Sequence, residues 1–339
     1  MPLTHIQAQD RAITALMRAV RANRVPNAWL FTGPEGVGKG LTARALAGVL
    51  VGPDAPDDVT RDGHAWRRVD EGVHPDVLWI EPQGAGRKVK IDQVREVVRS
   101  FRYAPFEAAR RVVVFPEADR LGEEAANALL KGLEEPPPHT VLILVSARPN
   151  ALLDTIRSRC QEVRFAPLPK DLCARLLVGL GVPVEDAAVA AALAEGSVGR
   201  GVQLAEAGIL EDRRATLQSV AELSLDRPAA LFDLAASWSS GGDASSSRSF
   251  LDARLDLLAS WYRDVAVSAA GHGDLIHSDL ADLCRRSATM GRRRALQCMD
   301  AINEARGALA LNAGARLTCE KLLVTLTTSA GHLPGRGWA

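Results

Sequence analysis

The feature that most restricts the fold of this chain is the stretch GPEGVGKGLTA at residues 33–43. Its residues Gly33, Gly36, Gly38 and Lys39 match a phosphate-binding loop, which joins a buried strand to a helix. The glycines let backbone N–H groups approach the phosphates of a nucleotide, and the lysine reaches the outer phosphates. The stretch therefore predicts a parallel α/β domain and makes these residues candidates for nucleotide binding.

The two positions that normally support the magnesium ion of such a site both lack a ligand. Gly40 stands where the loop pattern requires Ser or Thr, and Thr42 lies about 200° farther round the helix. The third predicted strand ends VVVFPEAD, with Pro116 in place of the first expected acid and Glu117 after it. Because Mg²⁺ neutralises charge on the transferring phosphates, the sequence predicts no metal site and no ATP hydrolysis by this chain. Binding of ATP without hydrolysis remains open, as does a loop that binds nothing.

Four apolar segments predict the strands of the α/β domain, at residues 28–34, 75–82, 111–115 and 140–147. Helical segments separate them, which favours a parallel sheet with helices on both faces. After Pro169 the strand pattern ends and the remaining chain is predicted to be helical.

These patterns divide the chain into an α/β domain at residues 1–167, a small domain of short helices at 168–208 and a larger helical domain at 209–339. A glycine-rich break is expected at 195–201, and a Ser/Gly-rich surface loop at 239–248. We find no internal repeats.

The charge and cysteine content exclude several classes of protein. Lys and Arg total 41, as do Asp and Glu, so the chain does not hold nucleic acid by a global positive charge. No apolar run approaches the roughly 18 residues that a membrane span needs, and the N-terminal residues lack the apolar region of a signal peptide. Five cysteines without a C-x-x-C pair indicate reduced thiols and a cytoplasmic location.

One long stretch is specific enough to suggest a family. The chain resembles the core of the bacterial DNA polymerase III clamp-loader subunits, which are AAA+ proteins, in AANALLKGLEEPPPHTVLILVSARPNALLDTIRSRCQ at residues 125–161. The segments VPNAWLFTGPEGVGKG, HPDVLWIEP and NAGARLTCEKLLVTL extend the resemblance over most of the chain. The missing metal ligands and the HPDVLWIEP segment are more similar to the delta-prime subunits than to the ATP-hydrolysing gamma/tau subunits. The resemblance implies that residues 1–167 form the AAA+ domain, 168–208 its lid and 209–339 an oligomerisation collar.

The resemblance also assigns residues to a catalytic role. In this family the arginine of the S-R-C motif is an arginine finger, which implies that Arg159, with Ser158 beside it in the catalytic motif, is offered to the ATP of a neighbouring subunit. A planar, permanently charged guanidinium suits that role because it stabilises charge on the transferring phosphoryl group. Ser158 and Cys160 would shape the turn. A merely local pairing of Arg159 is the alternative that the residues alone leave open.

Further residues have both a functional and a plain interpretation. Arg200, in GSVGRG, resembles the second nucleotide sensor of AAA+ proteins, or is a solvated arginine at a helix start. Ser146 is either in the first sensor region or an ordinary hydroxyl at a strand end. We interpret Glu134 and Glu135, before three prolines, as structural rather than as an acid–base pair. The basic run at 284–294 is a solvated helix face, or a contact with DNA or a partner.

The resemblance implies a hetero-oligomer in which this chain joins gamma/tau and delta subunits and helps load the sliding clamp on primer–template DNA during replication. It would then be a non-catalytic subunit of a DNA-directed DNA polymerase, a nucleotidyltransferase complex. Many such subunits carry a cysteine-rich zinc module, but residues 51–75 hold no cysteine, so no zinc is expected. Two alternatives remain: a gamma/tau-like subunit that hydrolyses ATP, and a module that binds ATP for structural purposes without turnover.

Overall fold

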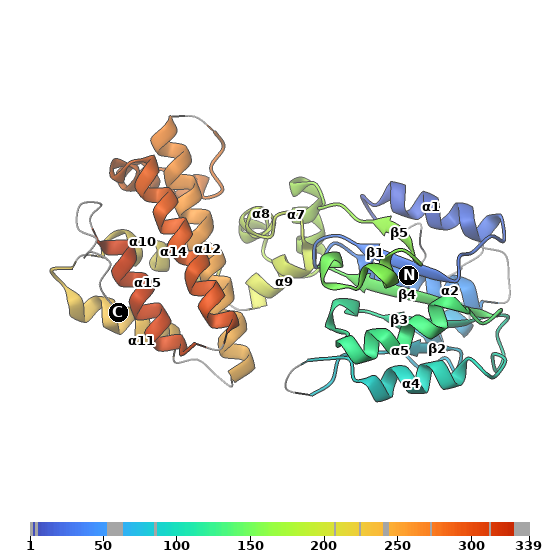
Figure 1. Cartoon of the computed structure of the whole chain (residues 1–339). Coiled ribbons are helices and arrows are strands. Elements are labelled where there is room, and N and C mark those ends of the chain that lie inside the picture. Colours follow the sequence, from blue (N-terminus) through green and yellow to red (C-terminus); the bar gives the residue numbers. More distant parts are fainter. Residues whose placement is uncertain are drawn as a thin grey trace. The chain divides into compact units, whose positions relative to one another are not determined.

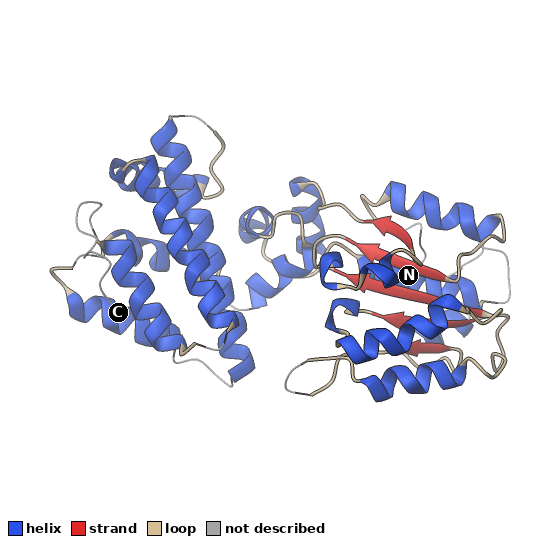
Figure 2. Ribbon diagram, viewed as in Figure 1, coloured by secondary structure: helices blue, strands red, loops and turns tan. Residues whose placement is uncertain are grey.

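The computed structural model of the chain describes residues 3, 6–52, 64–84, 87–206, 208–223, 225–239, 244–271, 273–311 and 313–328. Of residues 51–75, where no zinc module is expected, residues 53–63 lie outside this description. The chain divides into two compact units, one of residues 1–169 and 196–199 and one of residues 170–195 and 200–339 (Figure 1). In the described part of the chain all strands belong to the first unit, and the second is helical (Figure 2).

The first unit is built on a parallel sheet in the order β2-β3-β4-β1-β5. The strands are β1 (Ala28–Thr32), β2 (Val77–Trp79), β3 (Arg111–Phe115), β4 (Thr140–Ser146) and β5 (Gln161–Arg164). Every residue of β1, β3 and β4 is buried, as expected where helices cover both faces of a sheet. The predicted fold class, an α/β domain with a parallel sheet followed by a helical region, is confirmed.

The strand β5 has no counterpart among the four predicted strands. It lies at the edge of the sheet beside β1, and only Val163 of its residues is buried. Because most of its residues are polar and exposed, β5 contains no apolar run that could have predicted a strand. The Thr32 hydroxyl donates a hydrogen bond of 2.9 Å to Glu162, which joins β5 to the end of β1.

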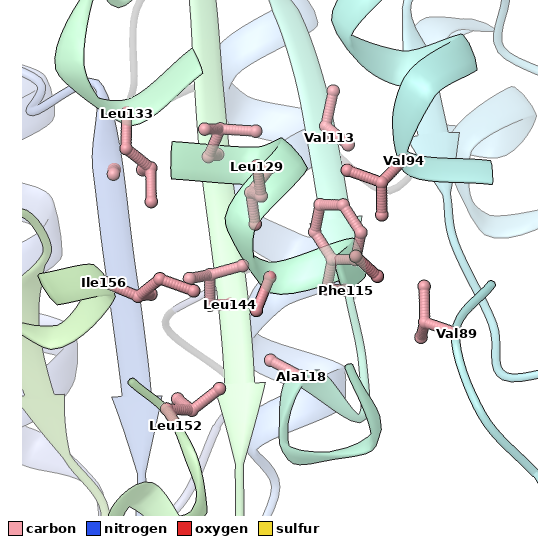
Figure 3. Packing of buried hydrophobic residues seen from close by; sticks show 14 of the residues in the cluster. Val89, Val94, Val113, Phe115, Ala118, Leu129, Leu133, Leu144, Leu152 and Ile156 are labelled. Atoms are coloured by element: carbon pink, nitrogen blue, oxygen red, sulfur yellow. The ribbon is translucent and has the colours of Figure 1, made fainter. Parts of the chain in front are cut away.

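Helices cover the two faces of this sheet. They are α1 (Asp10–Arg21), α2 (Lys39–Val51), α3 (His64–Asp70), α4 (Ile91–Ser100), α5 (Glu123–Glu134) and the short α6 (Asp154–Arg157). Alternate strand residues such as Val113, Phe115 and Leu144 point toward the apolar stripes of α4 and α5, where Val94 and Leu129 meet them (Figure 3). This cluster fixes α5 and the turn around α6 against the sheet.

The HPD sequence before β2 anchors the loop that leads into β3. The Asp76 carboxylate accepts hydrogen bonds of 2.6, 2.8 and 2.9 Å from the backbone N–H groups of Phe106, Glu107 and Ala108. Burial alone would raise the pKa of Asp76, but these three bonds and the nearby Arg111 lower it below its usual value. The loop is therefore tied to the amino-terminal edge of the sheet.

The second unit consists of helices joined by short connections. They are α7 (Lys170–Gly179), α8 (Val184–Leu193), α9 (Val198–Glu206, whose first residues belong to the first unit), α10 (Arg213–Ala221), α11 (Pro228–Ser239), α12 (Ala244–Ala270), α13 (Ala281–Ser287), α14 (Arg292–Ala310) and α15 (Ala315–Thr327). The two longest, α12 and α14, pack along each other (Figure 1). Trp261 and Tyr262 of α12 are buried. None of the described helices is long and apolar enough to cross a membrane.

The structure shortens the Ser/Gly-rich loop that the sequence predicted before α12. The loop expected at 239–248 is shorter, because α12 begins at Ala244, while residues 240–243 lie outside the described part.

Within the basic run at 284–294, Arg294 is half-buried and its guanidinium donates to the carbonyls of Thr325 and Leu326 at the end of α15, at 2.5 and 3.2 Å. The exposed arginines of that run are Arg285, Arg286, Arg292 and Arg293.

A buried polar network joins α10 and α12 to the segment before α13. Arg213 donates to Nδ1 of His277 at 3.1 Å and to both carboxylate oxygens of Asp279 at 3.0 and 2.5 Å. Asp264 accepts a bond of 2.7 Å from the backbone N–H of His277. Burial lowers the pKa of His277 to about 4 despite the opposing charge of Asp264. The ring is therefore neutral, and its Nε2–H donates to the Ser260 hydroxyl at 3.0 Å.

Candidate functional site

The phosphate loop lies between β1 and α2, as its sequence predicted, and its glycines serve different purposes. A Cβ at Gly33 would meet the Phe165 carbonyl oxygen at 2.2 Å, and one at Gly36 would meet the Ser197 hydroxyl oxygen at 2.2 Å. Both glycines also have positive φ angles, of 137° and 73°. At Gly38, with φ of 99°, no atom lies within 4 Å of the Cβ position. The first two glycines are thus required by the protein's own packing, while Gly38 leaves open space at the start of α2.

The rear of the phosphate loop is held by hydrogen bonds that the sequence did not indicate. The buried Gln9 amide donates to the carbonyls of Val37 and Ala166, at 3.3 and 2.7 Å. The Gly199 N–H donates to the Gly36 carbonyl at 3.2 Å. Gly199 already belongs to α9, so the glycine-rich break expected at 195–201 is shorter than predicted and ends before Val198.

Lys39 is directed at its own loop. Its ammonium group donates to the carbonyls of Gly33 and Pro34, at 2.7 and 2.5 Å, and the residue is buried. Burial lowers the pKa of Lys39, and the carboxylates of Glu35 and Asp119 oppose that shift. Two carbonyl groups of the loop therefore already accept hydrogen bonds from the Lys39 side chain.

The positions around the missing metal ligands are engaged elsewhere. The Thr42 hydroxyl donates to the Gly38 carbonyl at 2.8 Å within its own helix, as expected for a residue directed away from a metal. Glu117, after Pro116, accepts a hydrogen bond of 2.5 Å from Arg87. Among the residues that the structure describes, no group of three or more His, Cys, Asp and Glu side chains could hold a metal ion.

Asp119 is an acid near Lys39 that the sequence reasoning did not single out. Its carboxylate accepts a bond of 3.1 Å from the Ser146 hydroxyl and bonds of 3.0 and 2.8 Å from the Arg148 guanidinium. Asp119, which follows β3, thus links the ends of β3 and β4 through its hydrogen bond with Ser146 of β4. Gly38 and Lys39 are the residues that could meet the phosphates of a nucleotide, whereas Gly40 and Pro116 offer no side-chain ligand to its magnesium ion.

Arg159 lies between α6 and β5 and is held in place by two acceptors. Its guanidinium donates to the Thr155 carbonyl at 3.0 Å and to the Glu134 carboxylate at 3.0 Å. The Ser158 hydroxyl donates to the same Thr155 carbonyl at 3.2 Å. The Arg159 side chain is 36 % exposed, so part of the guanidinium faces the outside of the unit. The local pairing considered from the sequence is therefore present, and it leaves the group accessible.

The topology of the sheet separates Arg159 from its own phosphate loop. Arg159 precedes β5, the loop follows β1, and these strands are parallel neighbours with Trp29 opposite Gln161. Arg159 consequently lies at the amino-terminal edge of the sheet and the loop at the carboxyl-terminal edge. The five residues of β1 span roughly 16 Å between these edges, at the usual rise per strand residue. Phosphates in its own loop are out of reach of Arg159.

A cavity of about 380 Å³ lies beside Arg159, between the end of α5, the start of β1 and residues 158–161. Cys160 lines it, and burial raises the pKa of this thiol to about 12. A thiol with that pKa is not a nucleophile near neutral pH. All five cysteines are free, and the other four are buried.

Arg200, the predicted second sensor, has an acidic partner within the second unit. Its guanidinium lies 2.6 Å from the Asp256 carboxylate of α12, and Arg306 of α14 binds the other oxygen of that carboxylate at 2.6 Å. The plain interpretation, a solvated arginine at the helix start, is thus incomplete, because the side chain joins three helices. A role toward nucleotide stays a prediction.

Comparison with known proteins places the chain in a family. The family model described as "DNA polymerase III, delta subunit" matches residues 8–169. The DNA polymerase III subunit delta' of Bacillus subtilis is 28 % identical over 94 % of this chain and 96 % of its own length. This chain belongs to the delta-prime-like clamp-loader family. The delta' subunit of Pseudomonas aeruginosa is 34 % identical over 63 % of this chain and 66 % of that protein.

Other proteins similar to this chain are longer than it or share less sequence identity with it. The tau/gamma subunit of Haemophilus influenzae is 30 % identical over 64 % of this chain, which spans only 32 % of that protein. A crystal structure of a gamma subunit-related protein from Thermotoga maritima aligns with 94 % of this chain and 98 % of that one, with 18 % identity and a TM-score of 0.43. A likeness of that degree establishes neither function nor fold.

Proposed function

We propose that this chain is a delta-prime-like subunit of a DNA polymerase III clamp loader that offers Arg159 to the ATP of a neighbouring subunit and does not hydrolyse ATP itself. The observation that carries the proposal is the placement of Arg159 and the phosphate loop at opposite edges of one sheet. In a ring of similar subunits, the amino-terminal edge of one sheet then faces the loop of the next. Assembly with similar subunits is supported by relatives that are named as delta' and tau/gamma subunits of DNA polymerase III.

In the proposed mechanism, Arg159 stabilises charge on the phosphoryl group that leaves the neighbour's ATP. Its guanidinium has five N–H donors, of which two are used by Thr155 and Glu134, so three remain for phosphate oxygens. The Ser158 hydroxyl shares the Thr155 carbonyl with Arg159 and stiffens the turn that carries both residues. The chain thus contributes a fixed positive charge without a nucleotide of its own.

In this proposal, nucleotide held in the phosphate loop of this chain is not hydrolysed. The N–H groups near Gly36 and Gly38 and the Lys39 ammonium would hold the phosphates, whose hydrolysis is otherwise assisted by magnesium. Gly40 and Pro116 supply no ligand for that ion. These residues favour a rigid subunit over a gamma/tau-like ATPase.

We further propose that residues 168–208 act as the lid and 209–339 as the collar that binds delta and gamma/tau subunits. Support comes from large apolar side chains on the surface of α14 and α15 and the connection between them. Leu311, directly after α14, is 86 % exposed and Leu317 of α15 is 71 % exposed; Leu296 of α14 and Val324 of α15 are exposed as well. Exposed apolar side chains in this number favour packing against partner helices rather than contact with water.

A reconstitution experiment tests this assignment. Gamma/tau, delta and the sliding clamp encoded by the same genome are mixed with primed circular DNA and ATP, with or without this chain, and clamp loading is counted. We expect loading to fall to background without the chain and to recover when it is added. Full loading in its absence would refute the proposed function.

A further inference from the structure

The partner of Arg159 is an acid from a distant part of the chain. The Glu134 carboxylate, the last residue of α5, lies 3.0 Å from the Arg159 guanidinium, although the two residues are 25 positions apart. Half of the Glu134 side chain is exposed, so the pair lies at the surface of the amino-terminal edge. Nothing in the sequence resemblance assigns a role to this acid.

The local physics of α5 gives no reason for an acid at this position. The carboxyl-terminal end of a helix carries a partial negative charge, so an acidic side chain there is unfavourable and a basic one favourable. Glu134 nevertheless occupies the last turn, and its stabilising partner comes from the α6–β5 turn. Pro136, two residues later, prevents α5 from continuing beyond this point. The acid is therefore explained by Arg159 rather than by the helix.

The two acceptors of Arg159 approach it from different elements. Thr155 belongs to α6 and Glu134 to α5, so the guanidinium is fixed from two sides. A long arginine side chain loses rotamer freedom when it is ordered. Ordering it before the neighbour arrives removes that cost from the step in which it meets phosphate.

We infer that Glu134 is a positioning residue, which orients Arg159 toward the neighbouring subunit's ATP. The inference rests on the proposed role of Arg159 as an arginine finger. Glu134 does not touch the nucleotide; it binds one N–H of the guanidinium and so selects the direction in which the remaining donors point.

The test compares variants in the reconstituted complex with its partner subunits, clamp and primed DNA. Glu134→Gln keeps the size of the side chain but removes its charge, and Glu135→Gln removes the same charge one residue later, outside the hydrogen bonds of Arg159. Each is made alone and together with Arg159→Ala. Gel filtration checks that every variant assembles, and kcat and KM for ATP are measured separately.

We expect Glu134→Gln to lower the DNA-dependent kcat at the dependent site by about fivefold, with KM unchanged, and Glu135→Gln to have no comparable effect. In the Arg159→Ala background, Glu134→Gln should have no further effect, because it acts only through the arginine. A higher kcat in Glu134→Gln, an effect equal to that of Glu135→Gln, or an undiminished effect in the Arg159→Ala background would overturn the inference. A full kcat in Arg159→Ala alone would instead overturn the proposed function.

Discussion

Replacing Arg159 with alanine is expected to lower ATP hydrolysis at the one dependent site of the assembled complex by about 10³-fold, which is the usual contribution of an arginine finger. The variant should fold and assemble normally, because Arg159 is partly exposed and its two hydrogen bonds lie at the surface. Clamp loading on primed DNA should fall with the ATPase rate. Single-turnover hydrolysis in the reconstituted complex measures the effect without averaging over the other ATP sites.

Arg157 provides the matched control for this experiment. It lies two residues earlier, has a similar exposure of 41 %, and pairs with Asp154 at 3.1 Å rather than with Glu134. Arg157→Ala removes one positive charge from the same surface, so it reports any general electrostatic effect on assembly or DNA binding. Equal losses in the two variants, or full loading with Arg159→Ala, would contradict the proposed role.

Replacing Arg213 with alanine is expected to destabilise the helical unit by about 3 kcal/mol, since it removes a buried guanidinium and leaves the buried Nδ1 of His277 without its donor. Arg213 binds His277 at 3.1 Å and Asp279 through both oxygens, and it is only 8 % exposed. The effect should appear as a lower urea midpoint with a similar slope. The variant should also assemble less efficiently, because the predicted collar lies in this unit.

Arg214→Ala is the control for the stability measurement. Arg214 follows Arg213 on α10 and is exposed, so its loss should change the free energy of unfolding by less than about 0.5 kcal/mol. An Arg213→Ala midpoint equal to that of Arg214→Ala would mean that the network contributes little to stability.

Much of the first unit could be predicted because its signals are local. The phosphate loop is a contiguous pattern, and β1, β3 and β4 are apolar throughout. The strand β5 lacks such a signal, because it lies at an edge and buries only Val163. An edge strand needs one apolar face at most, so its composition does not distinguish it from a loop.

The contacts around the site could not be predicted, because they join residues far apart in sequence. Gln9 bonds Ala166 across 157 positions, and Asp119 bonds Arg148 across 29. Polar side chains of this kind give no periodic pattern, and their partners are decided by the packing of whole elements. Glu134 is similar: its position before three prolines indicated a structural role, while its pairing with Arg159 depends on how α5 and the α6–β5 turn meet.

ATP turnover by the isolated chain is the measurement that tests the central claim most directly. With magnesium and ATP at concentrations that saturate the assembled complex, we predict that the isolated chain hydrolyses no more ATP than the protein-free blank. We predict the same result for the isolated Arg159→Ala variant. Steady hydrolysis by the isolated chain, at a rate that Arg159→Ala leaves unchanged, would contradict the claim, because it would require a working magnesium site in a chain with Gly40 and Pro116.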